Sequence, residues 1–136
     1  GNQMLNPMAS SESFAKYPAE QKRLIDFIRE ARIPGVVFLS GDRHHSELIK
    51  RNEPGIYPLY DFTSSPLTSG PSNPTREENN PARVAGTLVK QQRNFGLIEA
   101  SGTARNRKLT LKTLDTAGKE LWRHEISQSE LAFPKT

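Results

Sequence analysis

The fold of this chain is decided by residues 36–48, VVFLSGDRHHSEL, where an apolar run meets a cluster of charged and imidazole side chains. Four consecutive apolar residues, 36–39, predict a strand that is buried on both faces of a sheet. The run stops at Gly41, which places the polar cluster at the carboxyl end of that strand. Open α/β sheets hold their ligand sites at this end of the strands. We therefore expect residues 42–47 to carry the chemistry of the molecule.

Two residues of this cluster form a candidate metal site. Asp42 and His44 are two positions apart, so in an extended segment their side chains point the same way. A carboxylate and a neutral imidazole suit metals that range from calcium to iron and zinc. The pattern therefore predicts ligands to one metal ion or to two. The alternative is structural: Asp42 caps a turn, and His44 and His45 are exposed loop residues.

Length and composition bound the molecule. With 136 residues and 34% hydrophobic residues, the chain allows one modest domain or a piece of a larger one. Gly1 stands where Met would be expected, which indicates a processed or excised segment. No apolar run approaches 18 residues, so no membrane span is predicted. The absence of cysteine excludes disulfides, thiolate metal sites and a cysteine nucleophile.

Positive charge is concentrated in the second half of the chain. Residues 81–136 hold 10 Lys and Arg against 5 Asp and Glu, whereas residues 1–80 hold 9 against 10. A solvated basic surface explains this, and so does a non-catalytic, basic, β-rich module that binds a polyanion. No zinc-finger spacing or arginine block supports nucleic-acid binding, so nucleic acid is expected only as a phosphodiester substrate.

The rest of the chain predicts a mixed α/β (α+β) fold. A helix opens at Tyr17-Pro18 with Leu24, Ile25 and Ile28 on its apolar stripe. Further strands are predicted at residues 56–63, 83–89 and 94–100, and a proline-containing loop at residues 64–81. Residues 108–114 and 120–126 flank a turn with Gly118, which predicts a β-hairpin near the end of the chain. On that hairpin, His124 alternates with apolar residues and is expected to pack in the core.

Four blocks, taken in order, resemble the C-terminal part of PhoD-like (alkaline phosphatase D) metallophosphatases of the calcineurin-like superfamily. They are GDRHHSEL at 41–48, YPLYDFTSSPLT at 57–68, NFGLIE at 94–99, and the hairpin that carries Leu121-Trp122. The resemblance runs from Gly1 to about Ile126. It implies a β-sandwich flanked by helices and ending in a β-hairpin. It also implies hydrolysis of phosphate mono- and diesters, with a periplasmic or extracellular location.

The resemblance implies a bimetal site of iron and calcium, for which Asp42 and His44 supply one ligand each. The family's earlier ligand blocks have no match here, so residues 1–136 are predicted to be the C-terminal segment of one domain whose N-terminal metal-binding half is its partner. Next to the ligands, Arg43 and His45 are predicted to contact the phosphoryl oxygens as catalytic residues. Glu47 or Asp61 is expected to hold an imidazole N–H.

Overall fold

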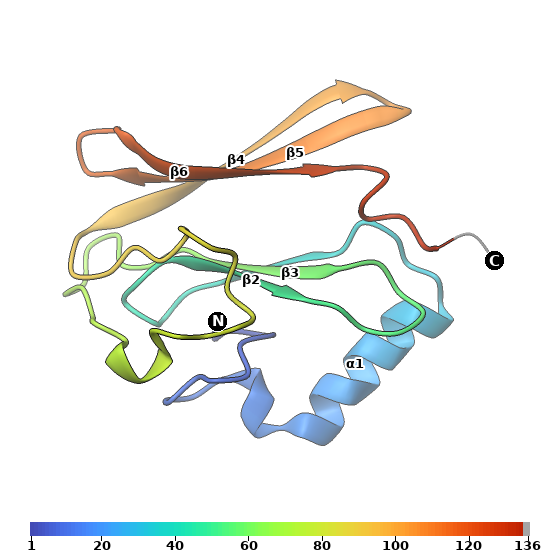
Figure 1. Cartoon of the computed structure of the whole chain (residues 1–136), viewed down its shortest axis with the longest axis horizontal. Coiled ribbons are helices and arrows are strands. Elements are labelled where there is room, and N and C mark those ends of the chain that lie inside the picture. The colour runs from blue at the N-terminus through green and yellow to red at the C-terminus, as the bar shows by residue number, and fades with distance from the viewer. Residues whose placement is uncertain (135–136) are drawn as a thin grey trace.

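The chain forms two three-stranded sheets that lie one above the other, with one α-helix on the far side of the first sheet (Figure 1). This computed structural model describes residues 1–134. It confirms the predicted α+β class, although a single helix, and not several, flanks the sheets among the described residues. None of the described helices is long and apolar enough to cross a membrane.

The first sheet carries the polar cluster at its edge. Its strands are β1 (Val37–Ser40), β2 (Glu47–Arg51) and β3 (Leu59–Thr63). Strand β3 lies in the middle, parallel to β1 and antiparallel to β2. All five residues of β3 are buried, because the second sheet covers one face and the N-terminal segment covers the other. The loop of residues 41–46 connects the two outer strands.

The second sheet is an antiparallel meander. Its strands are β4 (Asn94–Thr103), β5 (Asn106–Asp115) and β6 (Glu120–Ser127). The predicted hairpin is confirmed, since β5 pairs with β6 and Gly118 adopts a φ of 82° in the turn between them. Such a left-handed φ carries no steric penalty for glycine.

The helix α1 (Pro18–Glu30) begins at Pro18, whose missing N–H is no loss in a first turn. Ile25 and Ile28 are buried on its inner face, while Phe27 is 59% exposed. The helix ends at Glu30 with Ala31 as its C-cap, and the next residue, Arg32, has a positive φ of 49°. Two short 3-10 turns, η1 (Phe14–Lys16) and η2 (Thr75–Glu77), are the other helical elements of the described residues.

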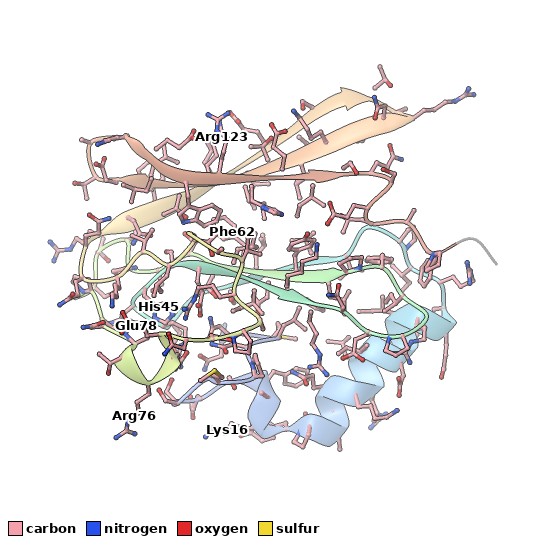
Figure 2. All side chains as sticks on the ribbon, viewed as in Figure 1. Lys16, His45, Phe62, Arg76, Glu78 and Arg123 are labelled. Atoms are coloured by element: carbon pink, nitrogen blue, oxygen red, sulfur yellow. The ribbon has the colours of Figure 1, made fainter. Side chains whose placement is uncertain are left out.

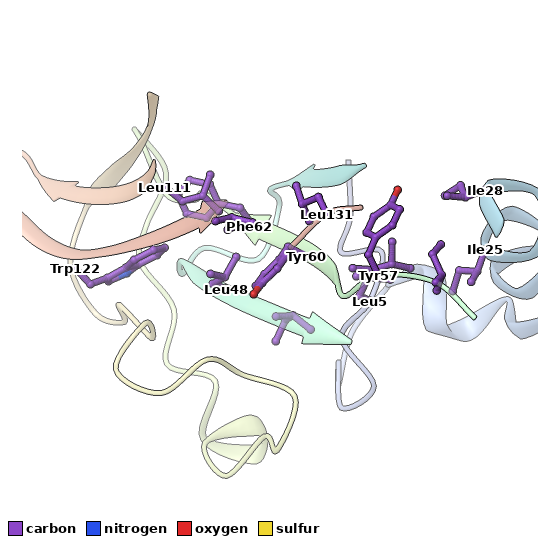
Figure 3. Packing of buried hydrophobic residues seen from close by; sticks show 14 of the residues in the cluster. Leu5, Ile25, Ile28, Leu48, Tyr57, Tyr60, Phe62, Leu111, Trp122 and Leu131 are labelled. Atoms are coloured by element: carbon purple, nitrogen blue, oxygen red, sulfur yellow. The ribbon is translucent and has the colours of Figure 1, made fainter. Parts of the chain in front are cut away.

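The hydrophobic core lies between the two sheets and continues toward α1 (Figure 3). Phe62 of β3 meets Trp122 of β6 edge to face, with ring centroids 5.4 Å apart. The ring centroids of the half-buried His124 and the core residue Tyr60 are 5.5 Å apart, which confirms a packing role for this histidine. Figure 2 shows Phe62 between the sheets and the side chain of Arg123 on the outer face.

Two of the predicted features are wrong, and one strand was not predicted. The strand at residues 36–39 is not buried on both faces, because β1 is an edge strand and Leu39 is 62% exposed. The sequence prediction missed β2, which follows the polar cluster immediately. The predicted strand at 83–89 is a loop that makes only isolated bridges, Ser46 with Val89 and Ile49 with Arg83.

Candidate metal centre

The loop after β1 alternates between exposed and buried side chains. Asp42 and His44 are exposed, whereas Arg43 and His45 are buried. The segment is not extended as predicted, because Asp42 and His44 adopt positive φ values of 66° and 59°. The two predicted metal ligands nevertheless share the solvent side of the loop. Their shared exposure follows from this local backbone and not from a strand's two-residue repeat.

The exposed side of the loop is fixed by contacts to neighbouring backbone. The backbone N–H of Gly41 donates to the carbonyl of Gly1 at 2.8 Å, and that of His44 donates to Ser65 Oγ at 3.1 Å. With its amide oriented to satisfy its neighbours, Asn2 donates to Asp42 Oδ2 at 3.1 Å. These contacts place the N-terminal segment and the chain after β3 against the loop that carries both predicted ligands.

The buried side of the loop is anchored by Glu77. The Arg43 guanidinium forms an ion pair with Glu77, and these side chains are 5% and 0% exposed. Glu77 also accepts hydrogen bonds from the backbone N–H and the hydroxyl of Ser10, at 2.8 and 2.9 Å, and from Asn6 Nδ2 at 2.9 Å. We call residues 41–46, which carry the two predicted ligands, the ligand loop. A single carboxylate from the proline-containing loop, Glu77, therefore joins the ligand loop to the N-terminal segment.

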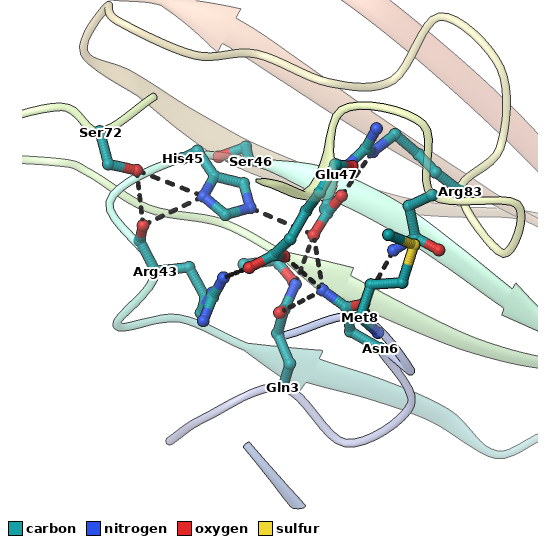
Figure 4. Close-up of polar contacts among 12 residues, drawn as sticks. Gln3, Asn6, Met8, Arg43, His45, Ser46, Glu47, Ser72 and Arg83 are labelled. Atoms are coloured by element: carbon teal, nitrogen blue, oxygen red, sulfur yellow. Dashed lines mark hydrogen bonds and ion pairs between the residues drawn. The ribbon is translucent and has the colours of Figure 1, made fainter. Parts of the chain in front are cut away.

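A second buried carboxylate, Glu47 of β2, completes the network (Figure 4). Its Oε1 lies 3.1 Å from His45 Nε2 and accepts a hydrogen bond from Gln3 Nε2 at 2.6 Å, while its Oε2 accepts one from Arg83 Nε at 2.5 Å. Burial by itself raises the pKa of Glu47, but the hydrogen bond and charge of His45, together with Arg83, lower it to about 2. We call the set Asn6, Arg43, His45, Glu47, Glu77 and Arg83 the anchor network.

Of the two carboxylates predicted to contact an imidazole, Glu47 and Asp61, only Glu47 does so among the described residues. Glu47 does contact an imidazole, but that imidazole belongs to His45 and not to His44. The contact of Glu47 fits the prediction that Glu47 or Asp61 holds an imidazole, and Asp61 itself contacts no histidine among the described residues. It accepts hydrogen bonds from the hydroxyl of Ser40 and from two backbone amides of the N-terminal segment, Met4 and Leu5. Burial raises the pKa of Asp61, and these donors oppose that rise.

The anchor network contains three side chains that are close enough to share an ion. Donor atoms of His45, Glu47 and Glu77 lie within 4.8 Å of one another. The two carboxylates, however, already face the guanidinium groups of Arg43 and Arg83. A divalent ion added there would add positive charge to a buried cluster whose carboxylates are already neutralised. The arrangement is therefore that of a closed hydrogen-bonded support.

A comparison with known protein families identifies the family of the chain. The family model for PhoD-like phosphatase matches residues 3–114. The chain belongs to the PhoD-like phosphatase family. No curated protein and no solved structure matches it significantly. The matched range includes the ligand loop and every member of the anchor network, and it ends within β5.

Membership of the PhoD-like phosphatases bears on the exposed side of the ligand loop. Phosphatase activity and metal dependence belong to the family, and the exposed pair Asp42 and His44 offers the donor types that such metals bind. Sequence reasoning missed Glu77, Asn6 and Arg83 as members of the site. No local pattern marks them, because their contacts (Arg43–Glu77, Glu47–Arg83 and Asn6–Glu77) span 34 to 71 residues of chain.

Proposed function

We propose that the chain supplies Asp42 and His44 as ligands to the bimetal centre of a PhoD-like phosphoesterase. The observation that carries this proposal is the alternation in the loop, which exposes these two side chains while their neighbours are buried in the anchor network. Within the proposal, the remaining ligands come from an N-terminal half of the same calcineurin-like domain, of which this chain is the C-terminal segment.

The donor set of the loop fits two different metals. The Asp42 carboxylate is a hard oxygen donor that suits calcium, and the His44 imidazole suits iron or zinc. Such a pair of ions would neutralise phosphoryl oxygens and generate a nucleophile from water at neutral pH. Calcium and iron are accordingly our assignment, and phosphate mono- and diesters are the proposed substrates. A periplasmic or extracellular location belongs to the same proposal and rests on the family resemblance.

The contribution of Arg43 and His45 differs from the catalytic contact predicted for them. Their side chains are buried, and each is held by a carboxylate of the anchor network. We therefore assign them to positioning: they fix the loop backbone so that Asp42 and His44 stay on its outer side. In this proposal Arg43 and His45 do not touch the phosphoryl group; they orient the residues that bind the metals.

Metal content per protein chain tests the proposed ligands in the full-length enzyme. Asp42→Asn removes the negative charge and should deplete calcium, with partial recovery of activity in excess metal. His44→Ala should deplete the transition metal and abolish turnover. Glu125→Gln, on the exposed surface of β6, is the matched control and should retain both metals. Full occupancy in both ligand variants would contradict the assignment.

The chain on its own should be a poor phosphatase. Asp42 and His44 offer two or three donors, whereas two metal ions need roughly twice as many. The purified 136-residue chain, stripped of metal and reloaded with iron and calcium, is assayed on an aryl phosphate. Turnover at ordinary enzyme rates would show that this segment needs no partner half.

The polyanion-binding alternative finds less support. Several cations of the basic half already face carboxylates, among them Arg83 with Glu47 and Lys112 with Glu99. A module that binds polyanions should show an affinity that falls steeply with salt. Binding of the protein to a heparin column, followed across ionic strength, separates the two functions.

A further inference from the structure

Strand β1 has one edge that the described residues leave unpaired. It pairs only with β3, and its Ser40 carbonyl faces that neighbour, because it accepts a hydrogen bond from the Ser64 N–H at 2.9 Å. Backbone groups of successive residues in a strand point to alternate sides. The N–H and C=O groups of Val37 and Leu39 therefore point away from β3, where no described residue is hydrogen-bonded to them.

The opposite edge of the first sheet is closed. Residues 82–89 run along the outer side of β2, where the Lys50 N–H donates to the Ala82 carbonyl at 2.8 Å. Ser46 and Val89 exchange two backbone hydrogen bonds there, at 3.0 and 2.8 Å. Within the part of the chain that the structure describes, β1 is thus the one edge of this sheet that is open to a further strand.

The open edge is apolar. Leu39 is 62% exposed, and Val37 and Phe38 are half-buried. Exposed edge strands in folded proteins are usually protected by charged residues, proline or a bulge, since an unprotected edge pairs with other chains. Residues 36–39 contain no charged residue and no proline. The composition of β1 is therefore that of a strand with a neighbour on both sides.

The N-terminal segment indicates what this neighbour is. The Gly41 N–H, which points to the same side as that of Leu39, donates to the Gly1 carbonyl at 2.8 Å, and the Asn2 amide reaches Asp42 Oδ2 at 3.1 Å. Residues 1 and 2 thus follow residues 41 and 42 in the direction of β1. A segment that leads into Gly1 in the same extended line passes first Leu39 and then Val37.

We propose that the residues immediately before Gly1 form a fourth strand of the first sheet, parallel to β1 and hydrogen-bonded to Val37 and Leu39. The inference rests on the proposed function, which places an N-terminal half before Gly1. In a parallel ladder an N–H donates to the carbonyl that precedes its register partner, as Ser64 and Ser40 do. The Gly41–Gly1 bond therefore sets the residue immediately before Gly1 opposite Leu39.

This strand would connect the N-terminal half directly to the ligand loop. It continues into Asn2, whose amide would then be held against the carboxylate of the proposed ligand Asp42. A second copy of the chain would also satisfy an open edge. However, Gly1 already occupies the Gly41 end of this one, which favours the chain's own segment.

Hydrogen exchange in the full-length enzyme tests the pairing with an internal control. The Phe38 N–H faces β3 and should be protected in any case, whereas the Leu39 N–H is protected only if the open edge is occupied. We expect the Val37 and Leu39 amides to exchange on the order of 100-fold more slowly than in an unfolded peptide, as Phe38 does. Free exchange at Leu39 beside a protected Phe38 would overturn the proposal.

An engineered disulfide tests the register and the identity of the strand. Neighbouring strands lie about 4.8 Å apart, within the range of roughly 4.4–6.8 Å that a disulfide spans between Cα atoms. Leu39→Cys, combined with a cysteine at the residue immediately before Gly1, should form an intramolecular disulfide. The matched control is Leu67→Cys, at a leucine that is 68% exposed, which should form none with that cysteine.

A disulfide-linked dimer of the Leu39→Cys protein would assign the edge to a second copy, and absence of any disulfide would refute the register; either result overturns the proposal. Neither measurement depends on turnover. An enzyme that hydrolyses no phosphate ester but protects Leu39 and forms the intramolecular disulfide would contradict the proposed function and support the fourth strand.

Discussion

Two buried ion pairs at the polar end of the first sheet contrast with two exposed ion pairs on the second sheet. At the polar end of the first sheet, Arg43–Glu77 and Arg83–Glu47 have side chains no more than 7% exposed. On the second sheet, Lys108–Glu125 and Arg123–Glu120 have side chains between 32% and 54% exposed. Water screens the second group and not the first. Only the buried pairs are therefore expected to determine where a backbone loop lies.

The comparison distinguishes buried charges, which position the ligand loop, from exposed charges, which are hydrated at the surface. Removal of one partner from a buried pair leaves the other charge without water or a counterion. Removal of one partner from an exposed pair returns the other to solvent. The predictions below test this difference from its largest consequence to its smallest.

Glu77→Ala should produce the largest loss of stability. It leaves the buried guanidinium of Arg43 uncompensated and removes the acceptor for Ser10 and Asn6. Loss of one partner of a buried pair costs about 3–5 kcal/mol. Urea denaturation of wild type and variant measures the free energy of unfolding. A loss below about 1 kcal/mol, the range of exposed pairs, would show that the anchor network is not structurally required.

Acid should act on the same network. The pKa of Glu47 is about 2 in the folded protein, against an ordinary value of 4.5. A depressed carboxyl pKa contributes stability that is present above pH 4.5 and is lost as the pH falls toward 2. The contribution is on the order of 3 kcal/mol. Between pH 6 and pH 2, the free energy of unfolding should therefore fall less steeply in Glu47→Gln than in the wild type. The comparison is made after each protein's value at pH 6 has been subtracted. Parallel pH profiles would contradict this.

Gly96→Val tests the contact between the two sheets. A Cβ at Gly96 of β4 would lie 2.7 Å from Ser64 Oγ and 2.8 Å from Phe62 Cζ, so the sheets must separate to admit a side chain. Overpacking of this kind costs about 1–3 kcal/mol. The matched control is Gly70→Val, whose added Cβ meets no atom within 4 Å. Thermal melts of the two variants should differ, and equal melting temperatures would be inconsistent with this packing.

Glu120→Ala should have the smallest effect. Its partner Arg123 is 54% exposed and remains hydrated when the carboxylate is removed. Exposed pairs contribute about 0.2–1 kcal/mol, and salt reduces this further. Denaturation at low and high ionic strength should show a difference from wild type that shrinks with salt. A loss as large as that of Glu77→Ala would remove the distinction between the two sheets.

The parts of the fold that the sequence predicts correctly depend on nearby residues. The β5–β6 hairpin follows from alternation on both sides of Gly118, and α1 follows from Pro18 and an apolar stripe. Strand β2 was missed because its charged residues, such as Glu47 and Lys50, interrupt the apolar pattern by which a strand is recognised. An apolar run such as 36–39 likewise does not distinguish an edge strand from a central one.

The candidate site shows the same division. The motif around Asp42 and His44 could be recognised from adjacent residues, and the family assignment supports the chemistry expected of it. The burial of Arg43 and His45 could not be recognised, because their partners Glu77 and Glu47 act only once the chain has folded. All four residues from 42 to 45 were predicted to act directly at the metal centre. The loop backbone instead places the side chains of Asp42 and His44 on the exposed side and those of Arg43 and His45 on the buried side.

The long sequence separations within the anchor network constrain the order in which the protein acquires its form. Arg43 precedes Glu77 by 34 residues, and Glu47 precedes Arg83 by 36. During synthesis the ligand loop therefore leaves the ribosome well before the residues that fix it. Contacts of such separation close large loops and form slowly. We therefore expect the geometry of Asp42 and His44 to be completed late in folding, after residue 83 has joined the first sheet.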